Sequence, residues 1–150
     1  MAQLKIEIPR IPNPADVAFL LSSLAANNGT LIQDPVMRQP QAAFYAFLRD
    51  GANEVCGGAY LQESFDIVYV NSFWISKPYR GQGYGARLYR AIEDLAYIQK
   101  KRRAVLCVFE FQKAVGFWER LGFNRFGEVP ADQNANRLIY MSKPIKSEAR

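Results

Sequence analysis

The feature that most constrains this chain is an alternating strand that leads through a glycine-rich turn into an amphipathic helix. Residues 66–75 alternate with the period of two that is typical of a β-strand. After Pro78 the period becomes that of a helix, with an apolar face made by Tyr84, Leu88, Ile92, Leu95 and Ala96. A strand, a turn and a helix in this order predict an α/β domain with free backbone N–H groups at the start of the helix.

The turn between strand and helix reads Arg80-Gly81-Gln82-Gly83-Tyr84-Gly85. Glycines let phosphate oxygens approach the backbone amides closely, and arginines at the mouth add charge-assisted hydrogen bonds. Three glycines alone could simply make a tight turn, but their place before a strong helix favours phosphate binding. The sequence therefore predicts a phosphate site in this turn.

Two other phosphate motifs fit less well. The Gly-Lys-Ser/Thr of a Walker loop is missing, and a loose dinucleotide fingerprint at Gly81, Gly83 and Ala86 begins five residues after the strand rather than directly. Only 40 residues follow Glu110, the candidate ribose-binding acid, which is too few for a doubly wound domain. An NAD(P)- or nucleotide-binding domain remains the first alternative.

The remaining patterns predict one domain over residues 1–150, with a loose tail at 144–150. Further strands are expected at 4–8, 43–48, 55–61, 104–109, 123–129 and 137–143, and further helices at 14–26 and 114–121. Residues 30–41 are ambiguous because Pro35 and Pro40 limit any helix there.

Composition excludes several classes of chemistry. The 150-residue chain has no histidine, so a Ser-His-Asp triad, a Cys-His pair and a Cys/His zinc site are impossible, and we expect no metal. No apolar run is long enough to span a membrane. Cys56 and Cys107 lie in apolar runs and are expected to be buried free thiols, which suits a cytoplasmic protein.

The net charge of +5 tolerates an anionic partner. A nucleic-acid-binding module using the basic run 100–103 is the second alternative. That run closes the predicted helix, where a solvated basic end is the ordinary outcome, so nucleic-acid binding is disfavoured.

The sequence resembles the GNAT superfamily of N-acetyltransferases. Arg80, Gly83 and Gly85 match the family's pyrophosphate motif, Gln/Arg-x-x-Gly-x-Gly/Ala. Residues 114–123 are similar to its Ala-x-x-Phe-Tyr-x-x-x-Gly-Phe helix, and residues 73–79 resemble the end of its fourth strand. The resemblance extends over nearly the whole chain, and residues 69–123 are its specific part.

The resemblance implies a single-domain α/β (α+β) fold. Its central sheet is mixed and mostly antiparallel, with six to seven strands and about four flanking helices. The fourth and fifth strands, here 66–76 and 104–109, splay apart, and acetyl-CoA is expected to lie between them. The cofactor-binding residues implied are Phe73, Trp74, Ile75, Arg80, Gly81, Gln82, Gly83, Tyr84, Gly85, Ala86 and Phe117. The basic run 100–103 could face the 3′-phosphate of the cofactor.

The implied activity is that of an acyltransferase, with direct transfer of an acetyl group from acetyl-CoA to a primary amine of a small molecule, peptide or protein. No motif in the sequence indicates which kind of amine is the acceptor. A homodimer is common in the family.

One departure from the family pattern concerns catalysis. The usual acid is a tyrosine, but this chain has Trp118, whose indole can donate a hydrogen bond but cannot give up its proton. Phe111 replaces a family asparagine. Three alternatives remain open. Another group, such as Tyr79, Tyr140, Cys107 or water, acts as the acid, or the thiolate leaves without an acid, or the domain binds CoA without transferring an acetyl group.

The candidate catalytic residues are therefore Trp118 together with Glu110 and Asn71. Glu110 ends the strand at 104–109 and is the first candidate for a base, although a solvated carboxylate is an equal interpretation. Glu63 and Asp66 are further carboxylates near the start of the preceding strand. Asn71 could hold a water molecule or the acceptor.

Overall fold

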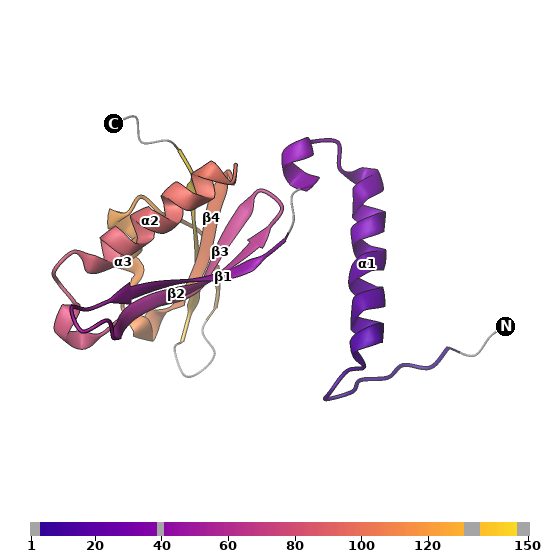
Figure 1. Cartoon of the computed structure of the whole chain (residues 1–150), viewed down its shortest axis with the longest axis horizontal. Helices are drawn as coiled ribbons and strands as arrows, with labels where there is room; N and C mark the ends of the chain where they lie inside the picture. The colour runs from indigo at the N-terminus through magenta and orange to yellow at the C-terminus, as the bar shows by residue number, and fades with distance from the viewer. Residues whose placement is uncertain (1–3, 39–40, 131–135, 147–150) are drawn as a thin grey trace. The chain divides into compact units, whose positions relative to one another are not determined.

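The computed structural model describes residues 4–38, 41–130 and 136–146. The chain divides into two units, Met1–Arg38 and Gln39–Arg150. Each unit is described by itself (Figure 1).

The first unit consists of helix α1 (Pro14–Leu31) and a short 3-10 helix, η1 (Pro35–Arg38). The expected N-terminal cap is confirmed, because Asn13 Oδ1 accepts a hydrogen bond of 2.8 Å from the N–H of Ala15. The helix continues five residues beyond the expected end at 26. One glycine within a helix costs only about 1 kcal/mol, and Thr30 Oγ1 donates to the carbonyl of Asn27 at 2.7 Å.

The prediction of a strand at 4–8 is wrong. These residues have no regular secondary structure, and Leu4, Ile6 and Ile8 are about nine-tenths exposed. An alternating pattern becomes a strand only when another strand pairs with it, and no described residue pairs with this segment.

The second unit is built on one six-stranded sheet in the order β1-β2-β3-β4-β6-β5. The strands are β1 (Ala43–Arg49), β2 (Val55–Ser64), β3 (Ile67–Ile75), β4 (Arg103–Phe109), β5 (Asn124–Val129) and β6 (Leu138–Pro144). All neighbours are antiparallel except β3 and β4, which are parallel. The expected mixed, mostly antiparallel sheet is confirmed.

Two α-helices and two 3-10 helices connect these strands. They are α2 (Tyr84–Ile98), α3 (Val115–Arg120), η2 (Lys77–Tyr79) and η3 (Glu110–Gln112). Together with α1, the described parts of the chain contain three α-helices rather than about four, because residues 32–38 of the ambiguous region contribute only the short η1.

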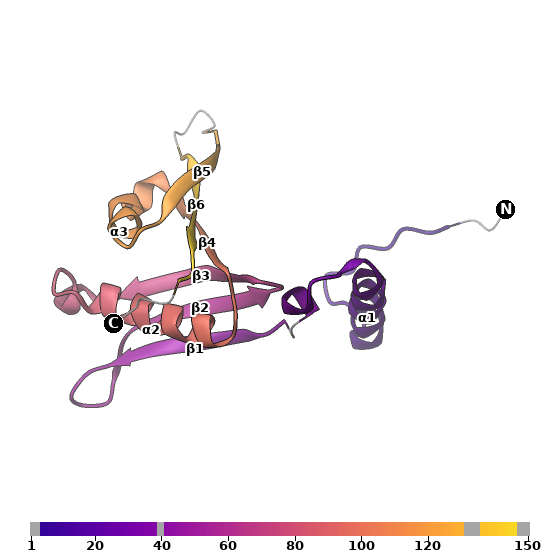
Figure 2. The same ribbon diagram turned by 90° about the horizontal axis from the view of Figure 1, so that it is seen from above.

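The sheet opens between β3 and β4. Their pairing covers only Ile67–Val70 against Arg103–Leu106, and the remainder of both strands is unpaired on this side. Figure 2 shows β4, β6, β5 and α3 turning away from the layer formed by β1, β2 and β3. A bulge lies where the opening begins, since Leu61 pairs with Val70 and Tyr60 with Ser72, which leaves Asn71 as the extra residue. The expected splay is confirmed.

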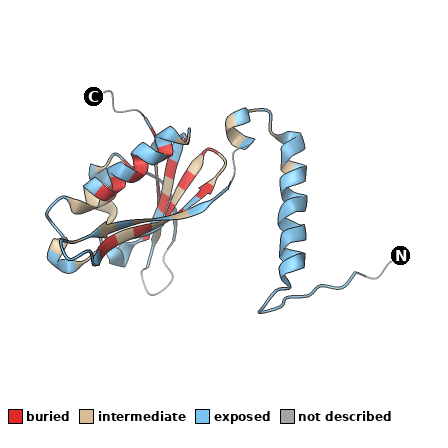
Figure 3. Ribbon diagram, viewed as in Figure 1, coloured by how far each residue is buried: buried red, intermediate tan, exposed pale blue. Residues whose placement is uncertain are grey.

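The core lies between α2 and the sheet (Figure 3). Helix α2 buries Leu88, Ile92 and Ala96, which are spaced by four residues and so share one face. Beneath them the sheet contributes fully buried side chains such as Leu61 and Met141. This packing holds α2 along the sheet and so places its N-terminus beside the opening.

Ion pairs hold the closed end of the β3–β4 pair. Lys101, with a side chain only 1% exposed, lies 3.7 Å from Glu63 and donates to the carbonyl of Phe65 at 2.9 Å. Arg103 donates to both carboxylate oxygens of Asp66 at 3.0 Å. The basic run 100–103 is therefore not a uniformly solvated patch, because Lys101 and Arg103 bind carboxylates within the fold.

The bounds of β5 and β6 agree to within one residue with the strands expected at 123–129 and 137–143. Gly122, with φ of 92°, ends α3 as expected from its left-handed position after the helix. Order extends into the segment expected to be a loose tail: Ile145 is buried and its N–H donates to the carbonyl of Arg102 at 2.8 Å. Residues 147–150 of that tail lie outside the described residues.

The buried ion pair predicts a large loss of stability on Lys101→Met. The change leaves the Glu63 carboxylate, which is 7% exposed, without its cation. Breaking such a pair from one side typically lowers the free energy of unfolding by about 3–5 kcal/mol. Urea denaturation checks this, with the exposed Lys146→Met as the matched control. Equal unfolding free energies for the two variants would show that the pair contributes nothing.

Candidate active site

A cleft of about 730 Å³ lies beside the opening in the sheet. One wall is the unpaired end of β3, and the other walls are the glycine-rich turn, the start of α2, and α3. The lining residues are Phe73, Trp74, Ile75, Tyr79, Arg80, Gly81, Gly83, Gly85, Ala86, Gln112, Ala114, Phe117 and Arg120. The structure thus brings together nine of the eleven residues expected to bind the cofactor.

The conformation of the turn requires two of its glycines. Gly81 has φ of 72° and Gly83 has φ of 82°, a left-handed region that other residues enter at a cost of about 1–2 kcal/mol. Gly83 is the N-cap of α2, so no side chain at that position can accept the first N–H groups of the helix. An anion placed there would satisfy them and would meet the positive end of the helix dipole.

Gly85 has a packing role in addition to the one expected. A Cβ atom at this position would lie 3.1 Å from the ring of Phe117, which is tighter than an ordinary contact. The residue therefore allows α2 to approach α3 across the opening. It also lines the cleft, so its expected contact with the cofactor stays a prediction.

The polar side chains of the turn mostly stabilise the turn itself. Arg80 Nε donates to the carbonyl of Ile75 at 2.7 Å, which ties the turn to the end of β3. Gln82 Nε2 donates to the carbonyl of Pro78 at 2.8 Å. Arg87 lies over the ring of Tyr84, with 5.7 Å between its guanidinium carbon and the ring centre. Gln82 and Tyr84 are the two expected residues that do not line the cleft.

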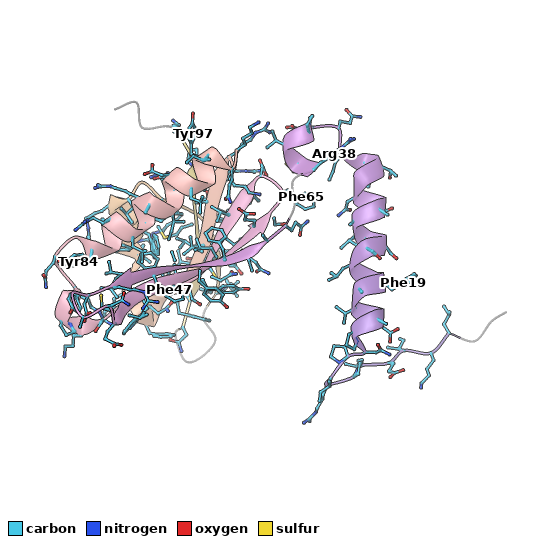
Figure 4. All side chains as sticks on the ribbon, in the orientation of Figure 1. Phe19, Arg38, Phe47, Phe65, Tyr84 and Tyr97 are labelled. Carbon is cyan, nitrogen blue, oxygen red and sulfur yellow. The ribbon has the colours of Figure 1, made fainter. Side chains whose placement is uncertain are left out.

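The basic run 100–103 cannot serve the same cleft. It follows the C-terminal end of α2, whereas the glycine-rich turn precedes the N-terminal end. Tyr84 and Tyr97 mark these opposite ends in Figure 4. A 15-residue helix is about 22 Å long, so the expected contact between this run and a 3′-phosphate is wrong for a ligand held in the turn. Arg120 lines the cleft and is the cation that sequence reasoning missed.

A second, inner cavity of about 290 Å³ lies within the opening between β3 and β4. Asn71 and Trp118 both line it, so two of the three candidate catalytic residues lie at one place. Asn71 Nδ2 donates to Gln62 Oε1 at 2.9 Å. Cys107 also lines this cavity and is exposed, which corrects the expectation that both thiols are buried; Cys56 is buried and both thiols are free.

Trp118 is mainly a packing residue. It is 4% exposed, and its ring lies against four other aromatic rings at centroid distances of 4.9–5.7 Å: those of Phe117, Phe73, Phe123 and Tyr89. These edge-on contacts connect α3 to β3 and α2. The tryptophan is therefore held in place by packing, and it forms part of the wall of the inner cavity.

Glu110 lies outside both cavities. Arg137 Nη2 donates to its Oε1 at 2.7 Å, and Arg137 Nε donates to Oε2 at 3.2 Å. The hydrogen bonds from Arg137 are the main reason why the pKa of Glu110 is lowered. A carboxylate that is held ionised in this way is a weak base near neutral pH, so the geometry does not favour Glu110 as the catalytic base. Glu63 and Asp66 are also occupied, by Lys101 and Arg103.

Two other candidate acids differ in position. Tyr79 lines the outer cleft and its hydroxyl donates to Asp50 Oδ2 at 3.3 Å. Removal from water raises the pKa of Tyr79, and the negative charge of Asp50 raises it further. Tyr140 lies on β6 near Phe126 and lines neither cavity.

Sequence reasoning missed Gln112, Ala114 and Arg120 as lining residues. All three lie on η3, on α3 or between them, and they reach the cleft only because β4 turns away from β3. Ala114 begins the motif segment 114–123, which was the only available signal for it. Among the described residues no group of acidic or cysteine side chains could hold a metal ion, and no helix could cross a membrane.

The sequence matches the model of a known protein family. The model of the Acetyltransferase (GNAT) family matches residues 14–123. A Bacillus subtilis subsp. natto (strain BEST195) protein named "Probable spermine N(1)-acetyltransferase" is 36% identical over 74 residues, which are 48% of this chain and 47% of that protein. The spermine/spermidine N(1)-acetyltransferase of Bacillus subtilis (strain 168) is 32% identical over 74 residues, with the same shares. The chain thus spans about half the length of these curated relatives.

The fold also resembles solved structures. The crystal structure of an acetyltransferase from Bacillus cereus ATCC 14579 superposes with a TM-score of 0.75 at 20% identity, covering 92% of this chain and 97% of that one. At this level of identity the likeness concerns the fold. It agrees with the mixed sheet and its opening described above.

The pairing of Glu110 with Arg137 predicts how its pKa responds to mutation. Arg137→Gln should raise the pKa of Glu110 toward its ordinary value, because the principal hydrogen bonds and the nearest positive charge are removed. Since the pKa is lowered in the folded protein, the stabilisation by this pair is present at neutral pH and is lost as pH falls through that lowered value. Carboxyl NMR titration measures the shift.

A weaker variant serves as the control for this titration. Arg125 acts on Glu110 only through its charge and is the last of the four causes. Arg125→Gln should therefore raise the same pKa by less than Arg137→Gln does. The reverse order would contradict the assignment of the shift to Arg137.

Proposed function

The chain belongs to the GNAT family of acetyltransferases, and from that premise we propose that it transfers the acetyl group of acetyl-CoA directly to a primary amine. The observation that carries the proposal is the outer cleft, which joins a helix N-terminus suited to phosphate with the unpaired edge of β3. One end of this cleft fits an anion and the other fits an extended arm that pairs with a strand.

The donor substrate fits the residues present. Gly81 and Gly83 have nothing within 4 Å of the position where a Cβ would stand, so the backbone at the start of α2 is open to phosphate oxygens. The backbone of Phe73, Trp74 and Ile75 has no strand partner on the side of β4 and can pair with an amide-containing chain such as pantetheine. Arg120 adds a positive charge to the same cleft.

The amine would enter from the inner cavity. Asn71 Nδ2 donates to Gln62, and its carbonyl oxygen is the atom that can accept a hydrogen bond from the amine. An alkylamine of pKa about 10.4 is neutral in on the order of 0.1% of molecules or less at pH 7. The described lining of the inner cavity is uncharged, so desolvation there favours the neutral form, while water carries the amine proton away.

The acceptor class is open to a direct screen. The two curated relatives are named for spermine and spermidine, so polyamines are the first amines to try. Amines with aromatic bodies come second, because a shallow apolar surface lined by Tyr45, Phe47, Tyr60 and Trp74 adjoins the inner cavity. Peptide and protein amines complete the set. We also propose a cytoplasmic site of action, which the free buried thiol of Cys56 supports.

Calorimetric titration with acetyl-CoA, CoA and NADH tests the donor, and release of free thiol with each amine tests transfer. Micromolar or tighter binding of acetyl-CoA, weak binding of NADH and amine-dependent thiol release are expected. Tight binding without thiol release from any amine would support CoA binding alone. Preference for NADH would contradict the proposal.

Gly83→Val should weaken acetyl-CoA binding at least tenfold. The side chain would stand where phosphate must approach, and a β-branched residue at φ of 82° is strained, which also lowers the free energy of unfolding by about 1–2 kcal/mol. The matched control is Gly127→Val, at an exposed position of β5 with open space around it. Unchanged affinity in Gly83→Val would exclude the turn as the phosphate site.

A further inference from the structure

The outer cleft and the inner cavity meet at a small set of shared residues. Five residues line both: Phe73, Trp74, Gln112, Ala114 and Phe117. The side chains of Phe73, Ala114 and Phe117 are wholly apolar. Trp74 has an indole N–H, and Gln112 ends in an amide. The junction therefore offers one side-chain amide on a largely apolar surface.

The sulfur of the donor belongs at this junction. This step rests on the proposed function. In acetyl-CoA the pantetheine arm lies on one side of the sulfur and the acetyl group on the other. An arm in the outer cleft and an acetyl group that meets the amine in the inner cavity place the sulfur where the two spaces join.

The amide of Gln112 has a defined orientation. Its Oε1 accepts a hydrogen bond of 2.8 Å from the N–H of Phe109, the last residue of β4. This bond leaves Nε2, with its two hydrogens, as the remaining polar atom of the side chain. A group that is already held by the backbone loses less conformational entropy when it donates to a ligand.

Other donors near the junction are less well placed. Trp74 alternates with Phe73 and Ile75 along β3, so its side chain points to the opposite face of the sheet, where it adjoins Tyr45, Phe47 and Tyr60 and is 53% exposed. Trp118 does not line the outer cleft and is enclosed by aromatic rings.

We propose that Gln112 Nε2 donates a hydrogen bond to the sulfur of the donor and stabilises the departing thiolate. The amine nitrogen forms the new N–C bond, the C–S bond breaks, and its electron pair goes to sulfur. The amine loses one proton to water, and the thiolate takes one proton from water on release. No proton leaves Gln112, which acts as a donor to developing charge rather than as an acid.

The pKa of the thiol of bound CoA tests this assignment without any amine. A hydrogen bond that favours the thiolate lowers this pKa relative to that of free CoA. Ultraviolet absorbance of the thiolate, recorded across pH for the protein–CoA complex against the complex with dethio-CoA, measures it. Gln112→Met, which removes the donor, should raise the pKa by about one, a tenfold loss of thiolate at a fixed pH below it.

Gln112→Glu separates the donor role from a structural one. A glutamate keeps an oxygen that can accept from Phe109 N–H but replaces Nε2 by a negatively charged oxygen. If Gln112 lies away from the sulfur and acts only by holding η3, this variant should resemble the wild type. If it donates to sulfur, Gln112→Glu should raise the thiol pKa more than Gln112→Met does, because a carboxylate repels the thiolate.

Kinetics give a second readout once an amine is found. In Gln112→Met kcat should fall on the order of tenfold or more while KM for acetyl-CoA stays within about threefold, since the hydrogen bond strengthens only as charge develops. Asn124→Asp, an amide-to-carboxylate change at an exposed position outside both cavities, is the control and should leave kcat unchanged.

The outcomes separate the two proposals. Binding of CoA with an unchanged thiol pKa in both Gln112 variants would overturn the role of Gln112 and leave the proposed function standing. A rise in Trp74→Phe but not in Gln112→Met would assign the donor to Trp74 instead. Failure of the wild type to bind CoA would overturn the proposed function, and this inference with it.

Discussion

The early end of pairing between β3 and β4 is the constraint on which the rest of the structure depends. After Val70 and Leu106 the two strands no longer exchange hydrogen bonds. Unpaired backbone groups in a sheet interior are costly unless a ligand or water satisfies them. The opening is therefore a place where a ligand or water can satisfy these backbone groups, and both cavities lie along it.

Opposite kinds of interaction hold the two ends of this strand pair. At the closed end, Lys101 and Arg103 bind the carboxylates of Glu63 and Asp66, and two backbone N–H groups donate to the Asp66 carbonyl. At the open end, Trp118 and its neighbouring rings fill the space between α3 and β3. The ionic end fixes the strands together and the aromatic end keeps them apart, so the shape of the opening does not depend on a ligand.

Local signals were sufficient for most of the fold. Alternation along β3 and the helical period of α2 depend only on nearby residues, and the hairpin of β1 and β2 follows from a turn between two apolar runs. The errors arose where partners distant in sequence decide the outcome. Residues 4–8 alternate but pair with no strand in the part of the chain that the structure describes. Lys101 belongs to a basic run but is buried beside the carboxylate of Glu63, 38 positions earlier.

For the candidate site too, residues that depend on nearby sequence could be predicted, and those that depend on distant partners could not. The turn at Gly81 and Gly83 could be predicted because positive φ and a helix N-terminus leave a mark in the sequence. Gln112 left none, since it reaches the junction only through the divergence of two strands. Its position also explains how position 118 can carry a tryptophan. That position lies in the core, where packing limits the choice of side chain, whereas η3 is an exposed turn whose residues can change without disturbing the core. Because the polar contact to sulfur comes from η3, stabilisation of the leaving thiolate does not depend on the side chain that packs beside the opening.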